Sequence, residues 1–487
     1  MNAHLALIVV LAAPLAHAFC VYVFSRPPGL RDVVHIGFSA LIAAATFVIV
    51  GEVSLRHHAR IVIAQPLPHV DLAFAIEPLG ALIAATMAAL GVLFAAHTAG
   101  MVRATGEPAP ARLMAEIALA SGAALAAAFA ANLFTFFVAL QALALATYPL
   151  AAHGGDQKAQ SGARAYLATL LVASAGLLLP AMVWTYALSG TLDFRPGGVF
   201  TAHVDPLAAN VLLALFAFGV ANTALPPLHR WLISSSGAGY SALVSIQALA
   251  VLPVGVMGLI KISAYILGPV QGEAVFVRQG LLALAAVSMC AAALIALSRQ
   301  DLRERLAFST MAQSMAAAMG VLLALPAGLF AAALQLIAMM SAAATLLMAA
   351  GATYAATGRR EARDYAGLGR LMPWTFAGFA LAAASMVGMP PFSGAWAKLW
   401  LITAAADAGL PWAAALAGLA TVLTFAHLGP LTGNAVAAPP PADAFKRADG
   451  ASIMLVAPVV LSGAATLLLL VLADSLSRFL APLWGGP

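Results

Sequence analysis

Charged residues are scarce in this 487-residue sequence: only 8% of the residues are Asp, Glu, Lys or Arg, whereas 63% are hydrophobic. An ordinary soluble domain has roughly 25% charged residues, so most of this chain cannot form a surface that faces water. The mean hydropathy of +0.98 agrees with that exclusion. The composition therefore predicts a polytopic membrane protein that lies in the lipid bilayer.

Cysteine and cofactor motifs are also scarce. The two cysteines, Cys20 and Cys290, lie inside apolar runs and lack the spacing of metal ligands. This excludes a zinc or iron–sulfur site built from cysteine. No glycine-rich nucleotide fingerprint follows a predicted strand, and no Walker sequence is present. We expect no catalytic residue, cofactor or metal in this chain, and the sequence leaves open whether the chain belongs to a larger enzyme.

Lys and Arg lie mainly in short connections between the apolar runs. The net charge is +5, but this placement favours a role in membrane topology over nucleic-acid binding. Over alternate connections, sixteen basic residues fall on one side and five on the other. Because the basic side usually faces the cytoplasm, we expect a multi-pass protein of a bacterial inner membrane with both termini periplasmic.

Fourteen apolar runs are each long enough to cross a bilayer, which takes about 20 residues. They lie near 4–24, 33–53, 77–101, 112–129, 131–152, 162–188, 206–235, 239–267, 277–298, 302–325, 327–356, 372–406, 410–430 and 452–474. The longest polar stretches, 54–76, 189–205 and 435–451, are too short for a soluble domain. The last of them is rich in proline and predicts a flexible cytoplasmic loop.

The seventh and twelfth spans are unusually long, and each contains a Pro-Pro pair. Pro226 and Pro227 lie in "ALPPLHRWL", and Pro390 and Pro391 lie in "GMPPFSGAWAKLW". Proline removes a backbone donor and frees carbonyls that lipid cannot satisfy. Because the twelfth span follows the seventh by an odd offset of five spans, the second copy runs in the opposite direction. The pattern indicates an inverted repeat, typical of an ion pathway in transporters, with a kink for helix packing as the alternative.

Four stretches together resemble one family of membrane subunits: "NLFTFFVALQALALATYPLAAHGG", "ALPPLHRWL", "SRQDLRERLAFSTMAQS" and "GLGRLMPWTFAGFALAAASMVGMPPFSGAWAKLWL". Over about residues 70–430 the sequence is similar to the antiporter-like subunits shared by respiratory complex I, membrane-bound hydrogenases and Mrp-type cation/proton antiporters, with the Mrp D-type subunit nearest. The resemblance implies an all-α fold of about fourteen transmembrane helices, with two inverted five-helix bundles and broken helices 7 and 12. It also implies homologous membrane subunits as partners.

The resemblance further implies a division of the chain into four parts. These are helices 1–3 at 1–111, the first inverted-repeat bundle of helices 4–8 at 112–267, the second bundle of helices 9–13 at 277–430, and a cytoplasmic loop with helix 14 at 431–487.

In this family a chain of buried ionisable residues follows the membrane midplane, but most of those positions are neutral here. The neutral positions are Gln141 and Asn222 on the fifth and seventh spans, Gln247 and Pro253 on the eighth, and Gln335, Met339 and Ala343 on the eleventh. Only the lysine of the twelfth span remains, as Lys398.

The family's Glu–Lys pair corresponds to Gln141 and Asn222, which cannot titrate and so cannot shift each other's pKa. Their amides keep the capacity to form hydrogen bonds and to hold the break together. We therefore expect a mainly structural subunit with a degenerate proton path. The alternative is a subunit that still conducts protons or cations through Lys398 and hydrated polar side chains. A free-standing enzyme is a third and weaker hypothesis.

Four further polar residues have two interpretations each. Lys398 lies well inside its span, which favours a buried functional or structural charge over a snorkelling lysine. Lys261 lies near the end of its span and is either buried or snorkels to the interface. Glu116 follows Arg112 by four residues, which favours an ion pair over a quinone or subunit contact. His229 follows the first break, where capping of freed carbonyls is favoured over proton transfer.

Overall fold

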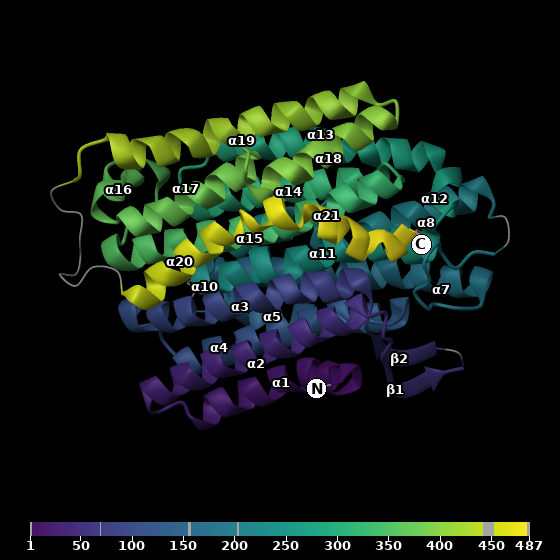
Figure 1. Ribbon diagram of the computed structural model, residues 1–487, viewed down its shortest axis with the longest axis horizontal. Helices are drawn as coiled ribbons and strands as arrows, with labels where there is room; N and C mark the ends of the chain where they lie inside the picture. The colour runs from purple at the N-terminus through teal and green to yellow at the C-terminus, as the bar shows by residue number, and fades with distance from the viewer. Residues whose placement is uncertain (1, 69, 154–156, 202–203, 442–451, 485–487) are drawn as a thin grey trace.

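The computed structural model describes residues 2–68, 70–153, 157–201, 204–441 and 452–484. Its helices lie side by side along the long axis of the molecule, from α1 (Ala3–Val23) and α2 (Pro28–Ser54) at one edge to α19 (Pro411–Ala437) at the opposite edge (Figure 1). Within these residues, ten helical segments are long and apolar enough to cross a membrane.

These ten segments coincide with ten of the fourteen expected spans. They are α1, α2, α3 (Pro78–Thr105), α4 (Pro110–Ala128), α5 (Leu133–Ala152), Ala159–Ser189, Tyr240–Leu267, α13 (Val275–Ser298), α15 (Pro326–Thr357) and α19. The sixth span is divided into α6 (Gln157–Ala173), the π-helix η1 (Ser174–Leu178) and α7 (Leu179–Ser189).

The other four expected spans differ from a simple apolar helix. The tenth is α14 (Leu302–Leu322), whose first turns carry several charges, and the fourteenth is divided into α20 (Ile453–Ala465) and α21 (Leu468–Leu480). The seventh and twelfth are the broken spans. The count of fourteen membrane crossings therefore stays a prediction. The short elements that complete the chain are α12 (Val270–Glu273), η6 (Ala362–Tyr365), α16 (Leu368–Leu371) and η7 (Ala481–Trp484).

Both predicted helix breaks are confirmed. In the seventh span, α8 (Pro206–Gly219) is followed by the 3-10 turn η2 (Ala221–Thr223) and, beyond the Pro-Pro pair, by α9 (Arg230–Ser234) and the 3-10 turn η3 (Ser235–Gly237). In the twelfth span, α17 (Pro373–Val387) ends before the second Pro-Pro pair and α18 (Ser393–Asp407) begins after it. Both Pro-Pro bonds are cis.

The eighth span lies at the centre of the bundle with α15, and both are buried along their whole apolar window. It consists of α10 (Tyr240–Leu243), the π-helix η4 (Val244–Leu249), α11 (Val251–Lys261) and the π-helix η5 (Ile262–Leu267). Pro253 cannot donate to the carbonyl four residues before it, which accounts for an irregular ladder where η4 meets α11. The family position at Pro253 thus disturbs the backbone of this span.

Polar side chains close the first turns of several helices. Asn2, Glu77, Asn132, Asp205 and Asp301 each accept a hydrogen bond from the backbone N–H groups that follow. These N–H groups have no partner within the helix, and lipid offers none. Several of the few polar residues in the sequence therefore lie at the N-terminal ends of helices.

The connection 54–76 contains the one departure from an all-α chain in the described residues. It forms an antiparallel hairpin of β1 (Arg60–Leu67) and β2 (Val70–Ala75), which projects at one end of the bundle (Figure 1). β2 also bonds to the segment after α4, where Ala75 N donates to Phe129 O. The sequence predicts only a polar connection at 54–76, and no strand.

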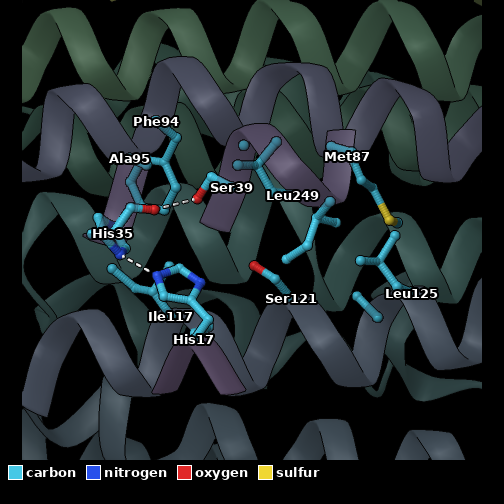
Figure 2. A pocket seen from close by; sticks show the side chains of 15 residues that line it. His17, His35, Ser39, Met87, Phe94, Ala95, Ile117, Ser121, Leu125 and Leu249 are labelled. Atoms are coloured by element: carbon cyan, nitrogen blue, oxygen red, sulfur yellow. Dashed lines mark hydrogen bonds between the residues drawn. The ribbon is translucent and has the colours of Figure 1, made fainter. Parts of the chain in front are cut away.

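A histidine pair joins the first two helices. His17 on α1 and His35 on α2 are both buried, and their Nε2 and Nδ1 atoms lie 2.9 Å apart (Figure 2). They adjoin a small cavity of about 40 Å³ between α1, α2, α3 and α4, which Ser39 and Ser121 also line. The hydrogen bond ties α1 to α2 in a layer that precedes both predicted bundles.

Candidate functional site

The first break is satisfied by neutral donors. Trp231 of α9 is fully buried, and its Nε1 donates to Ala221 O at 2.8 Å. Ser314 of α14 donates from its hydroxyl to Thr223 O at 2.6 Å. The carbonyls that the break frees from the helical ladder therefore accept hydrogen bonds from an indole and a hydroxyl, and these two contacts place no charge in the interior.

The second break is satisfied by a cation. Lys398 of α18 is buried, and its Nζ donates to Val387 O at 2.6 Å and to Met386 O at 3.0 Å. Both carbonyls belong to the last turn of α17. Among the described residues, no carboxylate lies within ion-pair distance of Lys398. The prediction of a buried Lys398 is confirmed, and its ammonium contacts the carbonyl end of a helix.

Gln141 and Asn222, the positions of the family's Glu–Lys pair, do not bond to each other. The Oε1 atom of Gln141 accepts from Ser174 Oγ at 3.0 Å, and its Nε2 donates to Phe137 O at 3.2 Å. Asn222 is buried in η2, and its Nδ2 has no hydrogen-bond partner in the described part of the chain. The expectation that the two amides hold the break together is therefore wrong, because α5 and η1 engage Gln141.

The glutamines of the eighth and eleventh spans are both buried. Gln247 in η4 has no hydrogen-bond partner for either amide atom among the described residues. The Nε2 atom of Gln335 on α15 donates to Oε1 of Gln313 on α14 at 2.9 Å. Sequence reasoning missed Gln313, since it lies on a span for which the resemblance supplied no position. None of these amides can bind or release a proton at ordinary pH.

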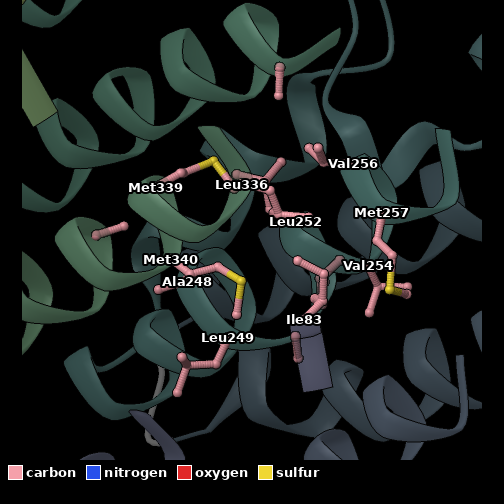
Figure 3. Close-up of a cluster of buried hydrophobic side chains, with 14 of the residues drawn as sticks. Ile83, Ala248, Leu249, Leu252, Val254, Val256, Met257, Leu336, Met339 and Met340 are labelled. Carbon is pink, nitrogen blue, oxygen red and sulfur yellow. The ribbon is translucent and has the colours of Figure 1, made fainter. Parts of the chain in front are cut away.

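An apolar cluster fills the contact between the eighth and eleventh spans. Ala248 and Leu252 of the eighth span lie in the same buried cluster as Leu336, Met339 and Met340 of α15 (Figure 3). All five side chains are buried. Met339 occupies one of the family positions on the eleventh span. The contact between these two spans is therefore lined by side chains that neither titrate nor form strong hydrogen bonds.

Lys261 does not snorkel. It is fully buried at the end of α11, where its Nζ lies 3.1 Å from Oε1 of Glu77 and 2.5 Å from Ala128 O. The hydroxyl of Tyr265 donates to Oε2 of Glu77 at 2.6 Å, and the Phe194 ring lies 5.3 Å from the ammonium. Lys261 thus joins α11 to the start of α3 and the end of α4.

Glu77 was missed because its role depends on contacts distant in sequence. Its carboxylate caps α3 through Leu79 N and Gly80 N. A Glu-Pro pair before an apolar run is a signal for such a cap, but it says nothing of Lys261.

The predicted ion pair of Arg112 with Glu116 is confirmed at 2.7 Å. Glu116 also lies 3.4 Å from Nδ1 of His153, and Glu107 lies 3.5 Å from Nε2 of the same ring. His153 follows the end of α5. Hydrogen bonds to the carboxylates of Glu107 and Glu116 raise the pKa of His153 to about 9, so its imidazole is protonated at neutral pH.

His229 lies at the start of α9, next to the first break. It interacts with the carbonyl of Pro227, as predicted for a cap, while its Nδ1 has no hydrogen-bond partner among the described residues. His229, His153 and Arg303 line one cavity of about 1040 Å³. A polar space therefore lies beside the segment that follows the first break.

Within the described residues, the predicted positions do not form one continuous hydrogen-bonded chain. Lys398 and Asn222 lie at separate breaks, Gln335 bonds to Gln313, and the amide of Gln247 has no hydrogen-bond partner there. His17 and His35, which sequence reasoning missed, lie on helices outside the region of resemblance.

The chain is similar to curated proteins over rather more than half of its length. It is 28% identical over 280 residues to NADH-quinone oxidoreductase subunit N of Desulforudis audaxviator, an alignment that covers 57% of this chain and 55% of that relative. It is 29% identical over 286 residues to NADH-quinone oxidoreductase subunit L of Mycobacterium tuberculosis, covering 57% of this chain and 43% of that relative. The chain thus matches only about half the length of these relatives.

Solved structures share the fold over almost the whole chain. A chain of the Mrp complex from Dietzia sp. DQ12-45-1b has a TM-score of 0.85 at 24% identity, and the match covers 99% of this chain and 98% of that one. A chain of respiratory complex I from Thermus thermophilus has a TM-score of 0.83 at 23% identity, with 98% of each chain covered. These likenesses establish the architecture.

The model of one membrane protein family matches residues 130–424, which include both helix breaks, the eighth span and α15. With that match over more than half of its length, the chain belongs to the family described as NADH:quinone oxidoreductase/Mrp antiporter, TM.

Proposed function

We propose that this protein is an antiporter-like integral membrane subunit of a multisubunit complex of the complex I or Mrp type, and that its role there is mainly structural. The observation that carries the structural part is the neutral residue at most of the family's ionisable positions, with Lys398 as the exception. The family's ionisable positions are occupied by Gln141, Asn222, Gln247 and Gln335, and apolar side chains fill the contact between α11 and α15.

Proton transfer along a buried route needs groups that bind and release protons, with short gaps between them. The amides cannot bind or release protons, and Leu252 and Met339, which lie buried on the eighth and eleventh spans, carry no titratable group. A buried charge costs several kcal/mol unless it is paired, so the loss of both members of the family's pair removes an electrostatic cost. A chain without these buried charges avoids that electrostatic cost, which suits a structural role in the complex.

The proposal includes neighbours and an orientation. The similar chains come from multisubunit complexes by their titles, and we propose homologous membrane subunits as partners for this chain. The excess of basic residues on one side supports an orientation with both termini in the periplasm of a bacterial inner membrane. The division at 111, 267 and 430 into two inverted bundles belongs to the same proposal. The connection 442–451, with Lys446 and Arg447, lies outside the described residues.

A second candidate function is a subunit that still conducts protons or cations. One observation favours it: Lys398 is buried at the second break without a carboxylate partner among the described residues, as expected of a group that exchanges a proton. In this alternative, waters and the Gln335–Gln313 pair complete the route.

Proton flux separates the two candidates. We would copurify the complex from native membranes, reconstitute it in vesicles and compare the parent with Asn222→Ala and Lys398→Met. The structural role predicts an unchanged flux per assembled complex in both variants. A large loss of flux with assembly intact would establish the conducting alternative. Recovery of the chain as a stable, active monomer would contradict the proposed role in a complex.

A further inference from the structure

The second break exposes two carbonyl groups at the end of a helix. Met386 and Val387 form the last turn of α17, and Gly388, with φ at +91°, turns the chain away from the helix axis. The carbonyl end of a helix carries roughly half a negative charge. Such an end inside a membrane stabilises a cation.

The ammonium group of Lys398 lies directly on these oxygens. Its Nζ is 2.6 Å from Val387 O and 3.0 Å from Met386 O, and the side chain reaches them by passing over Gly388, where a Cβ would lie 3.4 Å from Nζ. No carboxylate within the described residues balances the charge at ion-pair distance. The negative end of α17 is thus the group that holds this cation.

Two serine hydroxyls also lie at the second break, on either side of the Pro-Pro pair. The hydroxyls of Ser385 and Ser393 lie 2.9 Å apart at the same break, and Gly394 N lies 3.4 Å from Ser385 Oγ. Carbonyl and hydroxyl oxygens are the ligands that unwound helices offer to monovalent cations in transporters. At the first break, the described carbonyls of Ala221 and Thr223 already accept from Trp231 and Ser314.

We propose that the carbonyls of Met386 and Val387 form a binding site for a monovalent alkali cation, Na⁺ or K⁺, which the ammonium group of Lys398 occupies as a tethered cation. The lysine and a free cation compete for the same two oxygens, so the parent protein does not bind the ion there. The inference goes beyond the proposed function, since it holds whether or not the complex conducts protons.

The test removes the tethered cation and asks whether a free one replaces it. We would purify complexes carrying Lys398→Ala and measure the melting temperature of the chain in NaCl, KCl and choline chloride at equal ionic strength. The expected result is a loss of stability in choline that Na⁺ or K⁺ reverses with saturation, while the parent shows the same melting temperature in all three salts. The difference between the Na⁺ and K⁺ curves identifies the ion.

Two further variants control for charge and for space. Lys398→Met removes the charge but leaves a long side chain over the carbonyls, so we expect a destabilised protein that neither ion rescues. Trp231→Phe removes the indole donor to Ala221 O at the first break, a carbonyl that still accepts from Ala224 N, and its loss of stability should be independent of the cation.

A Lys398→Ala protein that melts at one temperature in all three salts overturns the proposal, and so does failure to assemble in all three. Should Lys398→Ala assemble poorly, the yield of assembled complex from membranes prepared in each salt provides the same comparison. A negative result here leaves the flux test unaffected, so the two proposals fail separately.

Discussion

The two helix breaks of this protein pose the same chemical problem and resolve it differently. Each Pro-Pro pair interrupts a helix inside the bundle and leaves carbonyls without their usual partners. At the first break, an indole and a hydroxyl donate to Ala221 and Thr223. At the second, Lys398 donates to Met386 and Val387. A broken helix in a membrane therefore does not by itself require charge.

The difference shows that two features of the family, the broken helix backbone and the buried charge, can occur separately. The broken backbone has been kept in both halves, whereas the charge remains in only one. A neutral hydrogen bond contributes about 0.5–1.5 kcal/mol and needs no counter-charge, while a buried ammonium must be balanced by a carboxylate or a helix end. The first break thus retains the architecture of a transporter without its titratable group.

The largest effect is expected at the other buried lysine, Lys261, which also contacts the carbonyl end of a helix but has Glu77 as its counter-charge. Lys261→Met leaves the half-buried carboxylate of Glu77 without its cation and should destabilise the protein by about 3–5 kcal/mol. Adding Glu77→Gln should recover much of this loss. Thermal unfolding of the two variants provides the measurement, and equal stabilities would show that the pair is not coupled.

The next largest effect tests whether the first break tolerates charge. Asn222→Lys places an ammonium in a buried turn whose Nδ2 position has no partner among the described residues, and it should cost about 2.5–3.5 kcal/mol. Gln141→Glu in the same protein should restore part of this by forming a pair. Assembly of the complex in membranes is the readout. If Asn222→Lys assembled as well as the parent, the first break would tolerate a charge, and a neutral residue at position 222 would not be required.

The sequence predicted where the two helices are broken, but not which side chains donate to the carbonyls at each break. Proline chemistry placed both interruptions correctly, and spacing alone predicted the pair of Arg112 and Glu116. The donors to the first break come from α9 and α14, and the choice of Trp231 and Ser314 depends on how those helices are rotated. A helix that is apolar all round gives no stripe from which its rotation can be read.

The same limit explains the other missed residues. Glu77 meets Lys261, and His17 meets His35, across helix contacts that no local pattern encodes. The hairpin at 60–75 was missed because neither of its strands, RIVIAQPL and VDLAFA, alternates apolar with polar residues. The fold of this chain is thus predictable from apolar length and helix breakers, whereas its polar contacts require the three-dimensional arrangement.

A smaller effect compares two buried serines of α14. Ser314 donates to a freed carbonyl of the first break, whereas Ser309 donates only to the sulfur of Met386 at 3.0 Å. Ser314→Ala should leave Thr223 O without its donor and cost about 1–3 kcal/mol, and Ser309→Ala should cost less because sulfur is a weak acceptor. Chemical or thermal unfolding would rank them. The reverse order would mean that the first break does not need its neutral donor.

The smallest effect is expected in the cavity beside the first break, which, unlike the break itself, is lined by charged side chains. His153 lies between Glu107 and Glu116 and has its pKa raised from 6.5 to about 9 by these carboxylates. Because the folded pKa is the higher one, the stabilisation is fully present below pH 6.5 and is lost as the pH rises through about 9. His153→Gln should therefore lower the melting temperature by a few degrees at pH 7 and by much less at pH 10, whereas Ser314→Ala should have the same effect at both values. A pH-independent loss in His153→Gln would mean that its contacts act by packing. In that case the cavity beside the first break would, like the break itself, be stabilised without a contribution from charge.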